Sequence, residues 1–478
     1  MISRIFGTLS RRGLSKWGQP HKDTHPHIIS QREHVNNGIS VMEFAERRSK
    51  LIQVLNENGF EKGLLVITGA CTSYMTDKIP YFFRQKTDFR YFSGCLEPSS
   101  SLTIDIANSN STLFLRDPDP RRELWEGPST SIEDAVSYFG VSDALPMSQF
   151  TEHLMQFRKA NDGRLLFDPS GPEWSVHEII KDLHNQKPFN SVVNPTPYIH
   201  AIRCIKSKAE IDLMLNSAIV SSHAFKRTMQ ATSSLETESD VFATMDYHVR
   251  MYNGANFLAY PPVVASGANA NIIHYISNNA ALHNGEMILM DAGGEYHGYS
   301  SDISRTWPIN GKFSLSQRVL YEMIYEVQTS IFHKLLEDPS KQTIDSLYSI
   351  MISELNRVIK SAGILRDGVN SSSLVHQLCP HHVSHYLGMD IHDTPLASKK
   401  NSLKPGMVIT VEPGIYISSS KFSQYVKKEF LDIGVRIEDD LLITHNGIDV
   451  LTKDCPKTIQ EIEEVMGSEE KVNYDTNL

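Results

Sequence analysis

Four carboxylates and one imidazole stand in distinctive contexts in the second half of this 478-residue chain: Asp291, Asp302, His385, Glu412 and Glu438. Asp291 ends a run of four apolar residues, where a carboxylate costs free energy unless something pairs with it. Carboxylate oxygens with one imidazole suit two hard divalent ions that share bridging oxygens. The five residues together therefore predict a dinuclear metal site.

The short motifs around these residues are ILMDAGG, SDISRT, HYLG, VEPG and VRIED. In this order they resemble the ligand motifs of the pita-bread metallopeptidases, a family that includes methionine aminopeptidase, prolidase and aminopeptidase P. The resemblance covers about residues 40–460. It implies that Asp302 and Glu438 bridge both ions, that Asp291 binds one ion, and that His385 and Glu412 bind the other.

Three further histidines, His274, His381 and His392, match by position the family's active-site histidines that are not metal ligands. An imidazole can donate to a substrate carbonyl or stabilise an oxyanion. The resemblance therefore implies a catalytic role for these three, whereas His382, next to His381, matches nothing and is interpreted as ordinary.

The sequence also suggests a role for Arg436 and a second role for Glu412. Arg436 precedes Glu438 by two positions, on the same face of a strand, and can bind a ligand carboxylate. Glu412 is a plausible acid–base group as well as a ligand. Because carboxylates outnumber imidazoles four to one, the ligand set favours Mn²⁺ over zinc.

Two divalent ions lower the pKa of water and generate hydroxide near neutral pH, which attacks the scissile carbonyl. The resemblance implies an aminopeptidase that hydrolyses the first peptide bond of peptides or proteins. Such an enzyme would either cleave Xaa-Pro amino termini or remove one bulky residue from imported mitochondrial proteins after presequence cleavage. Two alternatives stay open: a prolidase, which cleaves Xaa-Pro dipeptides, and a catalytically inactive pita-bread module used for binding.

The chain is long enough for two domains. Residues 39–197 alternate strands and helices, which is typical of an α/β layer, and stretches 83–98 and 123–127 resemble the amino-terminal domain of aminopeptidase P. Irregular structure is expected at the boundary, Asn194-Pro195-Thr196-Pro197. Residues 198–466 carry runs of mixed type and are expected to form a pita-bread catalytic domain, followed by an acidic polar tail at 467–478. The predicted fold class is α+β overall.

Residues 1–38 differ from the rest. The first acidic residue is Asp23, and Arg4, Arg11, Arg12 and Lys16 precede it. An Arg-rich, acid-free amphipathic segment is typical of a mitochondrial transit peptide, with a polar linker over about 17–38. Arg12 predicts a first cut before Leu14, and removal of Leu14 would then leave a new amino terminus.

Composition limits the partners. The net charge of −10 argues against a nucleic-acid-binding surface, and no apolar stretch is long enough to span a bilayer. Five scattered cysteines without a CxxC motif fit a reducing compartment. We therefore expect a mitochondrial matrix enzyme that acts on peptide or protein amino termini, as a homodimer.

Overall fold

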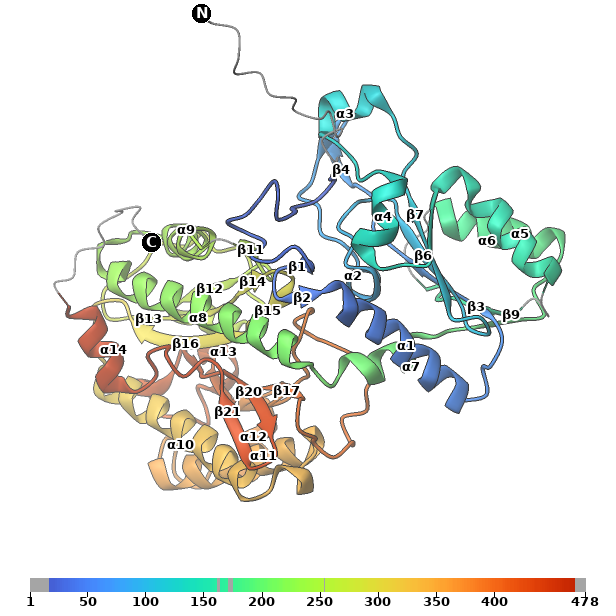
Figure 1. The fold of residues 1–478 in the computed structure, drawn as a ribbon. Helices are drawn as coiled ribbons and strands as arrows, with labels where there is room; N and C mark the ends of the chain where they lie inside the picture. The colour runs from blue at the N-terminus through green and yellow to red at the C-terminus, as the bar shows by residue number, and fades with distance from the viewer. Residues whose placement is uncertain (1–16, 161–163, 171–174, 253, 469–478) are drawn as a thin grey trace, which may run out of the picture. The chain divides into compact units, whose positions relative to one another are not determined.

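The computed structural model describes residues 17–160, 164–170, 175–252 and 254–468. The predicted transit peptide, with its cleavage before Leu14, lies outside these residues, as does most of the predicted acidic tail. The chain divides into two compact units between Ile202 and Arg203, and each is described by itself (Figure 1).

The first unit is built on a six-stranded mixed sheet with the order β10-β9-β3-β6-β7-β8. Leu64 and Val66 point from β3 toward α5 and α6, while Leu65 and Ile67 alternate to the opposite face. Helices thus cover both faces of the sheet, as the alternating sequence pattern predicts. The sheet strands are β3 (Leu64–Thr68), β6 (Ser101–Asp105), β7 (Asn110–Leu115), β8 (Asp143–Pro146), β9 (Arg164–Leu166) and β10 (Ser191–Val193).

The remaining elements of this unit are helices and two short hairpins. The helices are α1 (Val41–Glu57), α2 (Thr87–Ser93), α3 (Pro120–Glu126), α4 (Ile132–Phe139), α5 (Phe150–Ala160), α6 (Ser175–Gln186) and α7 (Thr196–Arg203). The hairpin strands are β1 (His34–Asn36), β2 (Ile39–Ser40), β4 (Tyr74–Thr76) and β5 (Ile79–Pro80).

Two local expectations are corrected here. Thr196 begins α7 where irregular structure is predicted, because Pro197 sits in the first turn, where a missing N–H costs nothing. The predicted linker packs onto the unit. The Gln19 side chain donates to the Gly94 carbonyl oxygen at 3.2 Å and accepts from the Leu96 N–H at 2.7 Å. These partners lie far along the chain, so composition did not reveal them.

The second unit places antiparallel strands between two helix pairs (Figure 1). Its sheets have the orders β11-β14-β15, β12-β13-β16, β17-β20-β21 and β18-β19. The strands are β11 (Ala255–Leu258), β12 (Val263–Ser266), β13 (Met287–Ala292), β14 (Gly294–Tyr296), β15 (Tyr299–Ser300), β16 (Ile303–Pro308), β17 (Val408–Val411), β18 (Gly414–Ile417), β19 (Ile433–Arg436), β20 (Asp439–Thr444) and β21 (Gly447–Val450).

The long helices of this unit begin at capping boxes. Ser207 and Glu210 form the capping box at the start of α8. The helices are α8 (Lys208–Ala231), α9 (Glu238–Arg250), α10 (Leu315–Glu337), α11 (Ile344–Ala362), α12 (Val375–Leu378), α13 (Ser419–Phe422) and α14 (Ile459–Met466). An α/β unit followed by an α+β unit confirms the predicted fold class. No helix among the described residues is long and apolar enough to cross a bilayer.

A fully buried ion pair joins β16 to β20. The Arg305 guanidinium lies 2.8 Å from the Asp439 carboxylate and also donates to the Glu438 carbonyl oxygen at 2.6 Å. Lys457 binds the other Asp439 oxygen at 2.6 Å. Because β16 follows Asp302 and β20 follows Glu438, this pair holds together the two strands that carry the predicted bridging carboxylates.

Replacing Asp439 with Ala should leave the Arg305 guanidinium buried without its partner charge, which costs about 3–5 kcal/mol of stability. We expect a clear fall in the urea midpoint of the full chain, measured by circular dichroism. The control is Glu326→Ala, which removes an exposed partner of Arg357 and should stay close to wild type. Equal midpoints for the two variants would contradict the assigned role of the buried pair.

Candidate metal centre

A glycine-dependent reversal of the chain brings Asp291 and Asp302 together. Asp291 lies near the end of β13, and Asp302 immediately precedes β16, which pairs antiparallel with β13. Between them, a Cβ at Gly293 would lie 1.7 Å from the Ser301 carbonyl oxygen, so that position accepts only glycine. Strands β13 and β16 are therefore paired, with β14 and β15 as an extra hairpin inserted between them along the chain.

Glu438 reaches the same point from the β19–β20 connection. Its backbone N–H donates to the Ser304 carbonyl oxygen at 3.0 Å, and the Ser304 hydroxyl donates to its carboxylate at 2.7 Å. Arg436, at the end of β19, donates to Asp291 Oδ2 at 2.6 Å and to the Ser304 hydroxyl at 2.8 Å. Arg436 thus binds a predicted ligand carboxylate, as its position on the strand suggested.

His385 and Glu412 come from β17 and the irregular segment beside it. The His385 N–H donates to Thr410 Oγ1, and the Glu412 N–H donates to the Val383 carbonyl oxygen at 2.9 Å. The imidazole Nε2 lies 3.4 Å from Asp302 Oδ2 and 3.5 Å from Glu412 Oε1. The structure thus brings His385 and Glu412 beside Asp302, and Arg436 beside Asp291.

The donor atoms fit a cation. Asp302, His385 and Glu438 each offer a ligand atom, and these atoms lie within 4.8 Å of one another. Burial first, and then the charges of neighbouring carboxylates, raise the pKa of Glu412 to about 7 and the pKa of Glu438 well above its ordinary value. So many buried carboxylates can all be ionised only if positive charge lies between them, which is what divalent ions supply.

The imidazole must also lose a proton to bind a cation. Burial alone would lower its pKa, but the hydrogen bond to Asp302 and the charges of Glu412 and Asp302 raise the pKa of His385 to about 9. A metal ligand histidine is neutral. The protein without metal therefore holds protons that an ion would displace.

Sequence reasoning missed Tyr260 and Asp440. The Tyr260 hydroxyl lies 2.6 Å from both Asp291 Oδ1 and Asp302 Oδ1, and its single proton can serve only one of them. Asp440 accepts the Asp302 N–H at 3.1 Å and the Ser301 hydroxyl at 2.9 Å. No local pattern marks Tyr260, whereas the acidic run beginning at Glu438 was a usable signal for Asp440.

The predicted catalytic histidines lie around this cluster. His392 stacks edge-on against His385, with ring centroids 4.7 Å apart, and His274 is exposed on the loop after β12. His381 lies 3.7 Å from Glu412 through Nδ1, and its Nε2 is 2.8 Å from the Tyr416 hydroxyl. Burial first, and then the charge of Arg436, lower the pKa of His381 to about 4, so its ring is neutral at physiological pH.

The adjacent histidine points elsewhere. His382 stacks on Tyr348 with ring centroids 4.8 Å apart, and its Nε2 lies 3.7 Å from Asp345. These contacts hold the His382 ring against α11, away from the predicted ligand carboxylates. Of the two neighbouring histidines, His381 is the one that faces the cluster.

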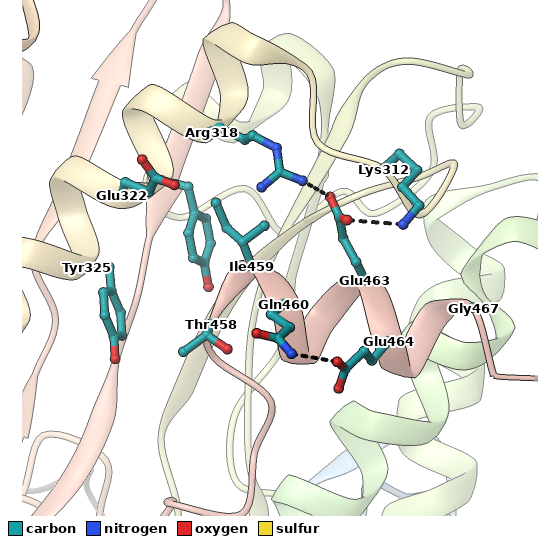
Figure 2. A pocket seen from close by; sticks show the side chains of 11 residues that line it. Lys312, Arg318, Glu322, Tyr325, Thr458, Ile459, Gln460, Glu463, Glu464 and Gly467 are labelled. Atoms are coloured by element: carbon teal, nitrogen blue, oxygen red, sulfur yellow. Dashed lines mark hydrogen bonds and ion pairs between the residues drawn. The ribbon is translucent and has the colours of Figure 1, made fainter.

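A hollow lies elsewhere in this unit, away from the carboxylate cluster. It measures about 770 Å³, is lined by the start of α10 and by α14, and includes none of the predicted site residues (Figure 2). Its two cations, Lys312 and Arg318, both bind Glu463 and are therefore already paired within the hollow.

Comparisons with known proteins agree with the site. Residues 212–445 match metallopeptidase family M24, and residues 44–167 match the aminopeptidase P N-terminal domain. The chain is 37% identical to Xaa-Pro aminopeptidase 3 of Rattus norvegicus, covering 94% of this chain and 90% of that protein. It is 34% identical to the mitochondrial intermediate cleaving peptidase 55 of Arabidopsis thaliana, with 94% and 88% covered.

Solved structures give the same result. Icp55 from Saccharomyces cerevisiae matches with a TM-score of 0.80 at 29% identity, covering 90% of this chain and 98% of that one. Aminopeptidase P from E. coli matches with a TM-score of 0.81 over the same shares, also at 29% identity. The family and enzyme class predicted from the ligand motifs are thereby confirmed: the chain is a metallo-aminopeptidase and belongs to the aminopeptidase P family of M24 metallopeptidases.

Proposed function

We propose that this protein removes the first residue from peptides or proteins at a site that holds two divalent ions. The observation that carries the proposal is the convergence of five residues from separate segments of the chain onto one buried point: Asp291, Asp302, His385, Glu412 and Glu438. We assign Asp302 and Glu438 as bridging ligands, with Asp291 on one ion and the remaining two residues on the other. When bound, the ions supply Lewis acidity and a nucleophile drawn from water near neutral pH.

The chain's own groups have proposed roles in orienting the substrate and moving protons. A carbonyl oxygen only accepts, so the 2.8 Å contact between His381 Nδ1 and the His382 carbonyl puts the ring proton on Nδ1. Its Nε2 then accepts from the Tyr416 hydroxyl, which in turn accepts from Arg436 at 2.8 Å. We propose that His381 acts together with Tyr416, and that Glu412 takes and returns the reaction's proton.

His274 and His392 have a different proposed task. Both are exposed beside the cluster, and imidazoles in such positions can donate to a carbonyl oxygen as negative charge develops on it. We propose that these two histidines contact the substrate, and that all of the catalytic residues act from within residues 198–466, the proposed catalytic domain.

Two substrate classes are proposed for this site: Xaa-Pro amino termini, and imported mitochondrial proteins that begin with one bulky residue after presequence cleavage. The relatives named intermediate cleaving peptidase 55 support the second class, and the one from Arabidopsis thaliana, named mitochondrial, supports a mitochondrial location, for which we propose the matrix. Prolidase is not favoured, because relatives matched over 94% of the chain are aminopeptidases. We further propose Mn²⁺ as the metal, a homodimer as the assembled form, and amino-terminal trimming of its own precursor.

The direct test of this function is amino-terminal sequencing of mitochondrial proteins with and without the enzyme. We expect proteins to gain one bulky amino-terminal residue when the enzyme is absent. A parallel assay compares an Xaa-Pro dipeptide with a longer peptide that has the same start. Cleavage of the dipeptide alone would instead identify a prolidase, and unchanged amino termini would contradict the processing role.

Within this site, the first prediction concerns the proposed bridging carboxylates. Asp302→Ala and Glu438→Ala should each abolish both peptide hydrolysis and the binding of two equivalents of Mn²⁺, because each carboxylate is assigned to both ions. Circular dichroism should stay native. Full activity of either variant, or of wild type stripped of metal by a chelator, would contradict the assignment.

The second prediction concerns pH. Protons on Glu438 and His385 must leave before an ion binds, and Glu412 also becomes protonated as the pH falls through about 7. The apparent Kd for Mn²⁺ should therefore rise on acidification from pH 8 to 6, by about tenfold per pH unit for each proton displaced. Calorimetry in buffers of different ionisation enthalpy measures the protons released, and a pH-independent affinity without proton release would refute this.

The third prediction concerns the histidines. His274→Ala, His381→Ala and His392→Ala should each lower kcat by about 100- to 1000-fold while two ions still bind. His382→Ala is the matched control, since its ring faces Tyr348, and it should be nearly neutral. Equal losses from His381→Ala and His382→Ala would show that the wrong histidine of the pair was chosen.

A further inference from the structure

The loop that carries His274 presents two apolar side chains to solvent. Along residues 272–276, Ile272 and Ile276 are 54% and 62% exposed, and His274 between them is also exposed. Ile273 and Tyr275 are only partly exposed and pack against a buried cluster. Side chains therefore alternate inward and outward, and the outward face is apolar on both sides of the histidine. We call residues 272–276 the His274 loop.

The inward face of the His274 loop packs against the catalytic centre. The cluster that receives Ile273 and Tyr275 consists of Val263, Ala265, Ala270, Leu289 and Tyr416. Within that cluster, the Tyr416 hydroxyl binds both His381 and Arg436 at 2.8 Å. Val263 pairs with Asp291 across β12 and β13. The loop is thus one wall of the proposed site, and its outward face carries His274, which is proposed to contact the substrate.

The loop is held at both ends by one buried carboxylate. Glu238 is fully buried and accepts from the Ser266 N–H and hydroxyl, before the loop, at 2.8 Å each. It also accepts from the Tyr275 hydroxyl and from the Ala280 N–H, both at 2.8 Å. An acceptor satisfied this fully fixes the segments that it joins. The exposed isoleucines are therefore presented in a preformed arrangement, which lowers the entropy cost of binding a ligand.

We propose that Ile272 and Ile276 bind apolar side chains of the substrate that follow its first residue. This inference rests on the proposed function and narrows it to peptides with apolar residues after the scissile bond. With the substrate's amino end at the metal ions, the rest of the peptide leaves past His274. The peptide then covers the two isoleucines, and removing their apolar surface from water stabilises the complex.

The test compares wild type, the double variant Ile272→Ser/Ile276→Ser, and Leu315→Ser. Leu315 is the matched control, because it is a large apolar residue of the same unit and is 85% exposed at the start of α10. Two peptides share their first two residues and carry either leucine or serine at the third to fifth. We expect the double variant to raise KM for the leucine peptide about tenfold or more. Its kcat, its melting temperature and its KM for the serine peptide should stay near wild type.

Binding is measured separately from catalysis with the leucine peptide whose first amide is reduced to CH₂–NH. Fluorescence anisotropy should show the same loss of affinity for the double variant and none for Leu315→Ser. Equal effects on both peptides, or no effect on the leucine peptide, would overturn the proposal while leaving the aminopeptidase function standing. If wild type hydrolysed neither peptide, the proposed function would fail, and the reduced peptide would still decide whether the isoleucines bind substrate.

Discussion

Electrostatic repulsion among buried carboxylates is the constraint on which the second unit depends. Asp302 and Glu438 are almost fully buried, and Asp291 and Glu412 lie beside them with little exposure. Gathering such groups in a medium of low dielectric constant is costly unless positive charge or protons are present. Arg436 provides one positive charge, at Asp291, and divalent ions are the remaining solution that the donor set favours.

Much of the surrounding structure holds these groups in place against that repulsion. Arg305 and Asp439 join the strands next to the proposed bridging carboxylates. On another side, the buried Asp393 carboxylate binds Arg203 and lies 3.1 Å from Lys206, which fixes the backbone beside His392. A rigid set of partners keeps the predicted ligand groups in position for binding. This positioning explains why charges are buried here, although a buried ion pair adds little net stability.

The sequence indicated the predicted ligand residues because each stands in a local motif. Asp291 ends an apolar strand, and Gly293 permits the close approach that returns the chain to Asp302. The contact of Tyr260 with Asp291 could not be predicted, because the two residues are 31 positions apart and no local pattern marks Tyr260. Asp440 stands in a recognisable acidic run, but its contact with Asp302, 138 residues away, depends on the fold. His381 and His382 are adjacent residues of the same type, so their chemistry alone could not distinguish them. Only the resemblance to a family motif indicated His381 as the candidate catalytic residue.

The two ends of the first unit were harder to predict, because residues there make contacts that their composition does not indicate. Composition describes residues 17–38 as polar, yet Gln19 is buried because its amide is satisfied by backbone groups far along the chain. A polar residue with complete hydrogen bonding can belong to a core as an apolar one does. Helix α7 likewise begins at a Pro-rich segment, because proline is unfavourable in the interior of a helix and acceptable in its first turn.

The central claim is that the five converging residues hold two ions. Anomalous X-ray diffraction at the manganese edge, on crystals of the protein grown with Mn²⁺, tests it most directly. The account predicts two peaks, both in contact with Asp302 and Glu438, with Asp291 on one side and His385 and Glu412 on the other. A single peak, or peaks that do not touch both Asp302 and Glu438, would contradict it.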